Sequence, residues 1–225
     1  METKMFSCIL RNLFTNAKKV YTFIISEAMR HKFPNRQFRQ NSQKLKELIL
    51  YISRSYANVQ YSGKTKLNKL LFAIDFDAFE KLGNPVTGAQ YKKGKNGPIP
   101  FSMIPVSAEM VENGELRFTE EKLGNFPQQR PIALRSPDMS VFSKEELAII
   151  NEWVETMRNE RAVDLSRWSH GLPIWEYSDN EGFIPYNRIY WKIPQSKDIT
   201  DRDRQIAEEI FKITGGKHIP RPRQL

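Results

Sequence analysis

The segment from Thr65 to Leu82 constrains the fold more than any other part of the sequence, because it sets two polar side chains within an apolar helix face. At about 100° per residue, its large apolar side chains fill an arc of roughly 200°. Asn68 and Asp75 fall in the middle of that arc. The rest of the circumference is charged and holds Lys66, Lys69, Asp77, Glu80 and Lys81. The pattern therefore predicts a carboxylate buried in the core.

A buried carboxylate without hydrogen-bond donors is strongly destabilising or takes up a proton. We therefore expect donors around Asp75, and the candidates are His170, Tyr91 and the backbone N–H groups of residues 95–97. Three roles are open for Asp75: pinning the Gly-rich loop to the helix, contacting a partner, or catalysis in a cleft. The sequence favours the pinning role, because no second acid or metal ligand accompanies Asp75.

Apolar spacing and turn residues predict the remaining elements. Thr65 is the expected N-cap of the central helix and Gly83 its left-handed stop. Residues 86–100, rich in Gly and Pro, are predicted to be irregular. Further helices are predicted at Met5–Met29, Gln43–Tyr56, within Phe101–Glu112, from a capping box at Ser143 to about Asn159, at Val163–Ser169 and at Thr200–Thr214. Two short strands, Glu115–Thr119 and Pro131–Arg135, are predicted to form a hairpin with a long polar loop. The fold class is thus mainly α (α+β), a compact helical domain of about five to six helices with a small antiparallel β-hairpin.

Charge divides the chain into a body and two basic ends. The first 46 residues carry ten basic and two acidic side chains, and the last 14 carry four basic and none acidic, so the net charge of +9 leaves −3 for residues 47–211. We interpret residues 1–42 as a basic N-terminal extension and linker, 43–211 as the domain and 212–225 as a basic Pro/Arg tail. Met29 is an alternative start within the extension.

Several kinds of chemistry lack their sequence signals. Neither G-x-x-x-x-G-K-[ST] nor G-x-G-x-x-G occurs, and one cysteine with three histidines does not supply a zinc site of Cys/His type. The single Cys8 fits a cytoplasmic protein. The longest apolar run near the start is much shorter than the roughly 20 residues that span a bilayer. We expect no catalytic residues, no cofactor, no metal and no membrane partner, and so not an enzyme.

Four short motifs occur in a specific order. Residues 66–76 read KLNKLLFAIDF, 83–91 read GNPVTGAQY, 96–100 read NGPIP, and 165–170 read LSRWSH with Pro173 and Trp175 following. Together, over residues 43–193, these motifs resemble the Panacea (SocA-like) antitoxin family. The resemblance implies an antitoxin that neutralises a cognate protein toxin by direct binding. SocA itself is described as an adaptor that delivers its toxin to a Clp protease, so a Clp-type protease is a candidate partner, but no motif of this sequence marks the adaptor role.

The candidate site residues come from these motifs and from the helix pattern. They are candidates for structural or partner-binding roles: Asn68, Asp75, Tyr91, Gly97, Pro98, His170 and Trp175. We expect Tyr91, Gly97, Pro98 and His170 to form a shaped loop cluster near Asp75. Aromatic residues gather late in the chain, at Trp168, Trp175, Phe183, Tyr186, Tyr190 and Trp191, and are either core residues or interface anchors.

An alternative function rests on the basic extension. Residues 1–42 could give weak DNA or RNA contact, in which case the chain is a nucleic-acid-binding regulator, or they could serve a proteolytic adaptor. The body lacks a clear helix-turn-helix, so this alternative depends on the extension alone.

Overall fold

The computed structural model describes residues 37–123, 126–176, 182–190 and 205. Apart from residue 205, all of these belong to residues 35–190, which form one compact unit. The predicted helix at Met5–Met29, nearly all of Thr200–Thr214 and the C-terminal tail lie outside the described residues. None of the helices in the described ranges has both the length and the hydropathy needed to cross a bilayer.

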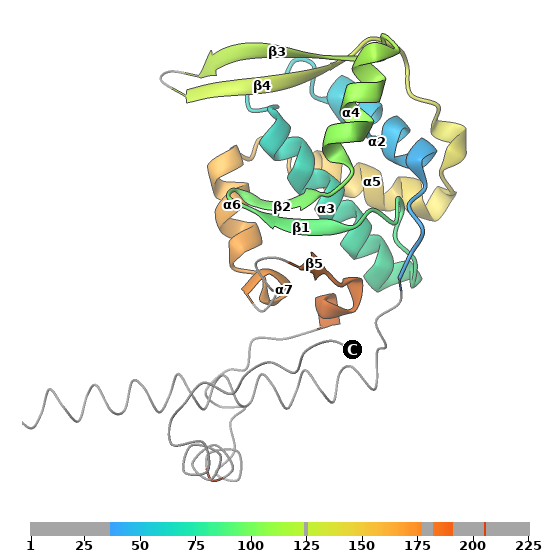
Figure 1. The fold of residues 1–225 in the computed structure, drawn as a ribbon, viewed down its shortest axis with the longest axis vertical. Helices are drawn as coiled ribbons and strands as arrows, with labels where there is room; N and C mark the ends of the chain where they lie inside the picture. The colour runs from blue at the N-terminus through green and yellow to red at the C-terminus, as the bar shows by residue number, and fades with distance from the viewer. Residues whose placement is uncertain (1–36, 124–125, 177–181, 191–204, 206–225) are drawn as a thin grey trace, which may run out of the picture. The chain divides into compact units, whose positions relative to one another are not determined.

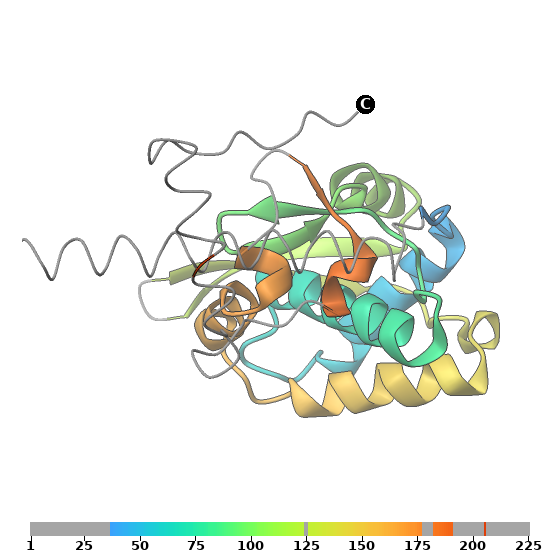
Figure 2. The same ribbon diagram turned by 90° about the horizontal axis from the view of Figure 1, so that it is seen from below.

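Helix α3 (Lys64–Leu82) runs through the centre of the unit. It packs against α2 (Ser42–Ser55), α5 (Lys144–Thr156) and α6 (Ala162–His170). Helix α5 lies on one side of α3, and the strands β1 (Tyr91–Gly94) and β2 (Gly97–Pro100) lie on the other (Figure 2). Side chains of all three layers meet in a single apolar core. Gly83 adopts φ 74° and ends α3 as predicted, whereas the N-cap is Gly63 and not Thr65.

A three-stranded antiparallel sheet lies against α3 (Figure 1). Its order is β2 (Gly97–Pro100), β1 (Tyr91–Gly94) and β5 (Phe183–Ile184). The prediction of an irregular stretch over residues 86–100 is wrong for this part, because Tyr91 pairs with Pro100 and Gly94 with Gly97. A strand of Gly and Pro carries little strand propensity by itself. Here the pairing is supported by tertiary contacts of β2 with α3 and α6.

The edge of β2 that faces away from β1 carries no hydrogen-bond donors. The N–H of Phe101 donates to the carbonyl of Gln90 at 2.7 Å. In an antiparallel ladder every second residue directs its backbone groups toward the paired strand, so residues 99 and 97 also hydrogen-bond to β1. Pro98 and Pro100 occupy the positions whose backbone nitrogen faces away from β1. Proline has no N–H, so this edge presents carbonyl groups only.

The predicted hairpin exists and is longer than expected. Strands β3 (Leu116–Leu123) and β4 (Phe126–Ala133) pair in register from Leu116–Ala133 to Leu123–Phe126. The prediction of short strands with a long polar loop is therefore wrong, since polar residues continue the ladder. Arg130 explains part of this, because it bonds Glu121 and the carbonyl of Ala57 and so ties the hairpin to the end of α2.

The remaining helices follow the predicted signals. Helix α4 (Met103–Glu112) holds Pro105 in its first turn, where no intrahelical hydrogen bond is lost. The capping box at the start of α5 is present, with Ser143 and Glu146 bonded reciprocally. The short α7 (Pro173–Glu176) and two 3-10 turns, η1 (Met139–Val141) and η2 (Tyr186–Tyr190), complete the unit. The mainly α fold class with small antiparallel sheets is confirmed.

The charged side of α3 departs from its prediction. Lys66 and Lys69, expected on the solvated face, are 0% and 1% exposed. Asp75 and Asn68 are buried as predicted. The helix is covered on more sides than its amphipathic pattern indicates, because the β1–β2 turn and the segment before α6 lie over the two lysines.

Candidate functional site

Asp75 is the centre of a buried polar cluster formed with Thr87, Tyr91 and Tyr186, here called the Asp75 cluster. The Thr87 N–H donates to Asp75 Oδ1 at 2.6 Å, and the Thr87 hydroxyl donates to Asp75 Oδ2. The Tyr91 hydroxyl donates to Oδ2 at 2.8 Å. The Tyr186 hydroxyl lies 3.3 Å from Oδ2 and 2.6 Å from the carbonyl oxygen of Ala89, its nearer acceptor. Both carboxyl oxygens of Asp75 are therefore satisfied within the chain.

The cluster joins three segments that are distant in sequence. Asp75 comes from α3, Thr87 and Tyr91 come from the loop and strand that follow α3, and Tyr186 comes from η2. The carbonyl of Thr87 also accepts a 2.8 Å bond from the Asn41 N–H, which ties the chain before α2 to the same loop. Gly88 has φ 66°, and a side chain there would meet the Arg39 carbonyl oxygen at 2.9 Å. The loop is thus fixed from several directions.

Burial governs the ionisation of this cluster. Asp75 has no exposed surface, and burial raises its pKa, although the bonds from Thr87, Tyr91 and Tyr186 oppose that rise. Burial and the nearby Asp75 also raise the pKa of Tyr91 and of Tyr186 well above the ordinary value. The tyrosines therefore remain neutral donors over the physiological pH range. The complete burial of Asp75 fits the predicted pinning role.

His170 is not a partner of Asp75, so this part of the prediction is wrong. The side chain of His170 is exposed at the end of α6 and stacks on Trp175, with ring centroids 4.6 Å apart. Burial lowers the pKa of His170, and the charges of Lys69 and Lys93 lower it further. The Lys93 ammonium lies 5.1 Å from the Trp175 ring centroid. His170 is the last residue of α6, and its exposed ring stacks on Trp175 instead of reaching Asp75.

Residues 95–97 do not donate to Asp75 either, but they bind a second buried group of α3. Lys69 Nζ donates to the Asn96 carbonyl, which also accepts a 3.0 Å bond from Ser166 Oγ of α6. We call Lys69, Asn96, Gly97, Ser166 and Ser169 the Lys69 cluster. Burial lowers the pKa of Lys69 to about 8. No carboxylate forms an ion pair with Lys69 among the described residues.

Gly97 is required at this place by its surroundings. Its φ is 111°, and a Cβ atom would clash with Lys69 Nζ and lie 2.6 Å from Ser169 Oγ. Pro98 follows in β2 and is buried. The turn therefore packs directly against α3 and α6 and leaves no room for a side chain at residue 97. This close contact accounts for the glycine in the Asn-Gly-Pro sequence, and residue spacing alone does not predict it.

The other buried polar side chains of α3 differ in how well they are satisfied. Lys66 Nζ donates to the carbonyls of Arg158 and Glu160 at 2.7 and 2.9 Å, and burial lowers its pKa to about 8. Asn68 is 7% exposed, and its amide oxygen has no partner among the described residues. Nothing in the structure explains that orphaned oxygen.

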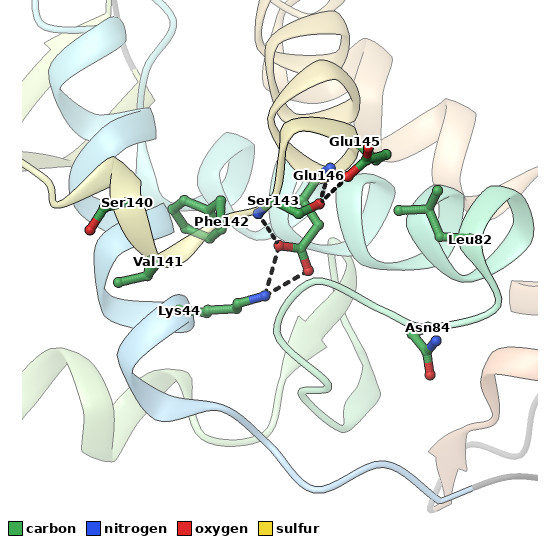
Figure 3. Close-up of a pocket in the computed structure, with 9 residues that line it drawn as sticks. All are labelled: Lys44, Leu82, Asn84, Ser140, Val141, Phe142, Ser143, Glu145 and Glu146. Carbon is green, nitrogen blue, oxygen red and sulfur yellow. Dashed lines mark hydrogen bonds and ion pairs between the residues drawn. The ribbon is translucent and has the colours of Figure 1, made fainter.

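A separate pocket of about 570 Å³ lies at the start of α5 (Figure 3). Its polar groups bond one another, since Lys44 pairs with Glu146 at 2.7 Å and the Ser143 N–H donates to Glu146 at 2.8 Å. None of the seven predicted site residues lines it. Within the described ranges, no group of three or more His, Cys, Asp or Glu side chains is placed to hold a metal ion.

The four motifs thus converge on α3. The first contributes Lys69 and Asp75, the second Thr87 and Tyr91, the third Asn96 and Gly97, and the fourth Ser166 and Ser169. Residues 67–176 match the family model of the antitoxin SocA-like, Panacea domain. Residues 67–176 are a Panacea domain. The Asp75 cluster extends just beyond the matched range, because Tyr186 lies outside it. No curated protein and no solved structure matches the chain.

Sequence reasoning found some members of these clusters and missed others. Asp75 and Tyr91 were predicted and do bond each other. Thr87, Tyr186, Lys69 and Ser166 were not among the predicted site residues. The signal for Thr87 was present in the GNPVTGAQY motif, since a Thr-Gly pair after a Pro-Val is able to offer a hydroxyl and a backbone N–H to one carboxylate. No local pattern marks Tyr186, which lies 111 residues after Asp75.

Proposed function

We propose that this Panacea domain protein is the antitoxin of a toxin–antitoxin system, which neutralises a cognate protein toxin by direct binding in the cytoplasm. The observation that carries the proposal is the family match over residues 67–176. The motif residues support a binding role over a catalytic one, because their polar side chains form hydrogen bonds within the fold. The most buried acid, Asp75, has both oxygens occupied by donors of the chain and no exposed surface, so a substrate does not reach it.

The same geometry underlies the proposal that the chain acts without catalysis. A general base needs its acceptor within about 2.6–3.2 Å of a substrate proton. In the Asp75 cluster those acceptor positions are filled by Thr87 and Tyr91. Delivery to a Clp-type protease and contact of residues 1–42 with DNA or RNA stay predictions, since the extension lies outside the described residues.

Growth rescue tests the proposal directly. The open reading frames on either side of the gene are each induced alone and then together with the full chain. We expect one of them to arrest growth alone, growth to resume with the chain, and the two purified products to form a complex. If neither neighbour arrests growth, or if the arrest persists with the folded chain present, the proposal is overturned.

A further inference from the structure

Helix α4 has apolar residues on two sides. One side enters the core with Met103, Val106 and Met110, which are at most 7% exposed. The opposite side presents Ile104, Ala108 and Val111 to solvent, at the i, i+4, i+7 spacing of one helix stripe. Ile104 is 73% exposed and Val111 is 45% exposed. A surface helix ordinarily turns a polar face to water, so the outer stripe is unusual.

The stripe continues onto the sheet through Phe101, which lies two residues before Met103, the first residue of α4. Phe101 is 57% exposed and meets Phe183 of β5 edge to face, with ring centroids 5.4 Å apart. Ile99 lies on the same face of the sheet, because Lys92 pairs with Ile99 on β2 and with Phe183 on β5. Helix α4 and these strands lie on the side of α3 opposite α5 (Figure 2). We call Lys92, Ile99, Phe101, Ile104, Ala108, Val111 and Phe183 the outer face.

This concentration is specific to one surface. Seven large apolar side chains of the described residues are exposed, and four of them belong to the outer face. The other three, Leu82, Leu134 and Val163, stand on separate elements. Scattered apolar residues are normal on a protein surface, whereas a continuous group indicates a place where another molecule binds.

The charge of the outer face selects the partner. Lys92 Nζ lies 4.2 Å from the ring centroid of Phe101 and 5.0 Å from that of Phe183, so the two rings hold the ammonium at the surface. No ion pair of Lys92 or of Lys95 occurs among the described residues. Of the two acids on α4, Glu109 pairs with Lys46 and Glu112 is exposed at the last position of the helix. A carboxylate from outside the chain is the complement of this fixed cation.

We propose that the outer face is the docking site for an amphipathic helix of the toxin, which lays an apolar stripe along α4 and places a carboxylate against Lys92. The stripe from Ile104 to Val111 is about 10 Å long, the length over which a helix contributes residues at i, i+4 and i+7. The proposal rests on the antitoxin function above. Aromatic rings and a cation at the centre of an apolar surface are typical of the residues that contribute most to binding.

The test uses the full chain and the neighbouring gene product that the growth assay identifies as toxic. Variants I104E and K92E are compared with K92R, which keeps the cation, and with V163E, which changes an exposed aliphatic residue on α6. We expect I104E and K92E to weaken the dissociation constant at least tenfold and to lose growth rescue. K92R and V163E should bind within about threefold of the parent, and all four should melt at the parental temperature.

The outcomes separate this inference from the antitoxin function. Wild-type-like binding by I104E and K92E, with a parent chain that neutralises the toxin, overturns the docking site alone. Failure of the parent chain to bind the toxin overturns both. Sedimentation of the free parent as a dimer, with I104E monomeric, overturns the assignment of a toxin helix and shows that a second copy covers the face.

Discussion

Asp75 and Ile104 mark two extremes of the same unit. Asp75 is a carboxylate with no exposed surface, and it is surrounded by hydroxyl and N–H donors of its own chain. Ile104 is an aliphatic side chain that is 73% exposed, on a helix whose opposite side already lies in the core. The interior thus holds a carboxyl group whose oxygens are both hydrogen-bonded, and the outer face holds apolar side chains exposed to solvent. Polar groups inside this unit serve folding, and we infer that apolar groups outside serve binding.

Replacing Asp75 by Ala should have the largest effect on stability. The change leaves the Thr87 N–H, the Thr87 hydroxyl and the Tyr91 hydroxyl buried without their acceptor, at a cost of about 3–5 kcal/mol in the free energy of unfolding. For a domain of this size that loss lowers the melting temperature by about 10 °C. D75N, which keeps the shape and one carbonyl acceptor, should lose less. Thermal and urea unfolding measure both, and a D75A variant as stable as the parent contradicts the pinning role.

Gly97 tests the other interior cluster. In G97A the new methyl group meets Lys69 Nζ and Ser169 Oγ at less than contact distance, and the backbone has φ 111°. We expect a loss of about 2–3 kcal/mol. Gly114 is the matched control, because its φ is 68° and nothing lies within 4 Å of a Cβ atom there. G114A should cost only about 1 kcal/mol, so equal losses in urea unfolding argue against close contact at Gly97.

The buried lysines should make stability depend on pH. The folded pKa of Lys69 and of Lys66 is lowered from 10.5 to about 8. Between pH 8 and 9.5 the unfolded chain therefore binds more protons than the folded chain, and the free energy of unfolding rises with pH. The rise is at most about 1.4 kcal/mol per pH unit for each lysine. Well below pH 8 both states are protonated and this contribution is constant.

Urea unfolding at several pH values from 7 to 9.5 measures that slope. K69M keeps the length and packing of the side chain and removes the titrating group. Its slope should be smaller than that of the parent, and the double variant K66M/K69M should be nearly flat. A parent whose stability does not rise over this window contradicts the burial of the two ammonium groups.

The outer face should contribute the smallest effect on stability. Ile104 is so exposed that I104E leaves the core intact, and the free energy of unfolding should change by less than about 0.5 kcal/mol. V163E should behave alike. A loss above about 1 kcal/mol in I104E, measured by urea unfolding of the free chain, indicates that Ile104 packs within the monomer and removes the contrast with Asp75.

The buried polar residues of α3 were predictable from the sequence, because their burial depends on helix geometry. Winding Thr65–Leu82 into a helix was enough to bury Asp75 and Asn68, and the caps at Gly83 and Ser143 followed from residue type. The partners of Asp75 were harder to predict, because donors come from wherever the chain returns. Tyr91 was among the candidates, whereas His170 was placed at Asp75 wrongly and instead stacks on Trp175.

The lysines show why the rest was not predictable. Helical periodicity puts Lys66 and Lys69 on the charged side of α3, where solvent is the ordinary surrounding. Their burial depends on carbonyl groups of Asn96, Arg158 and Glu160, which no pattern within the helix reveals. The outer face was only partly visible: Phe183 was named as a possible interface residue, and its neighbour Phe101 was not.

The proline pattern of β2 has a consequence for the behaviour of the chain in concentrated solution. Exposed sheet edges ordinarily recruit further strands and lead to fibrous assembly. At the β2 edge Pro98 and Pro100 are buried and lack an N–H, so a second strand gains few bonds there. The apolar outer face beside it can therefore stay open to a partner's side chains while the neighbouring strand resists polymerisation.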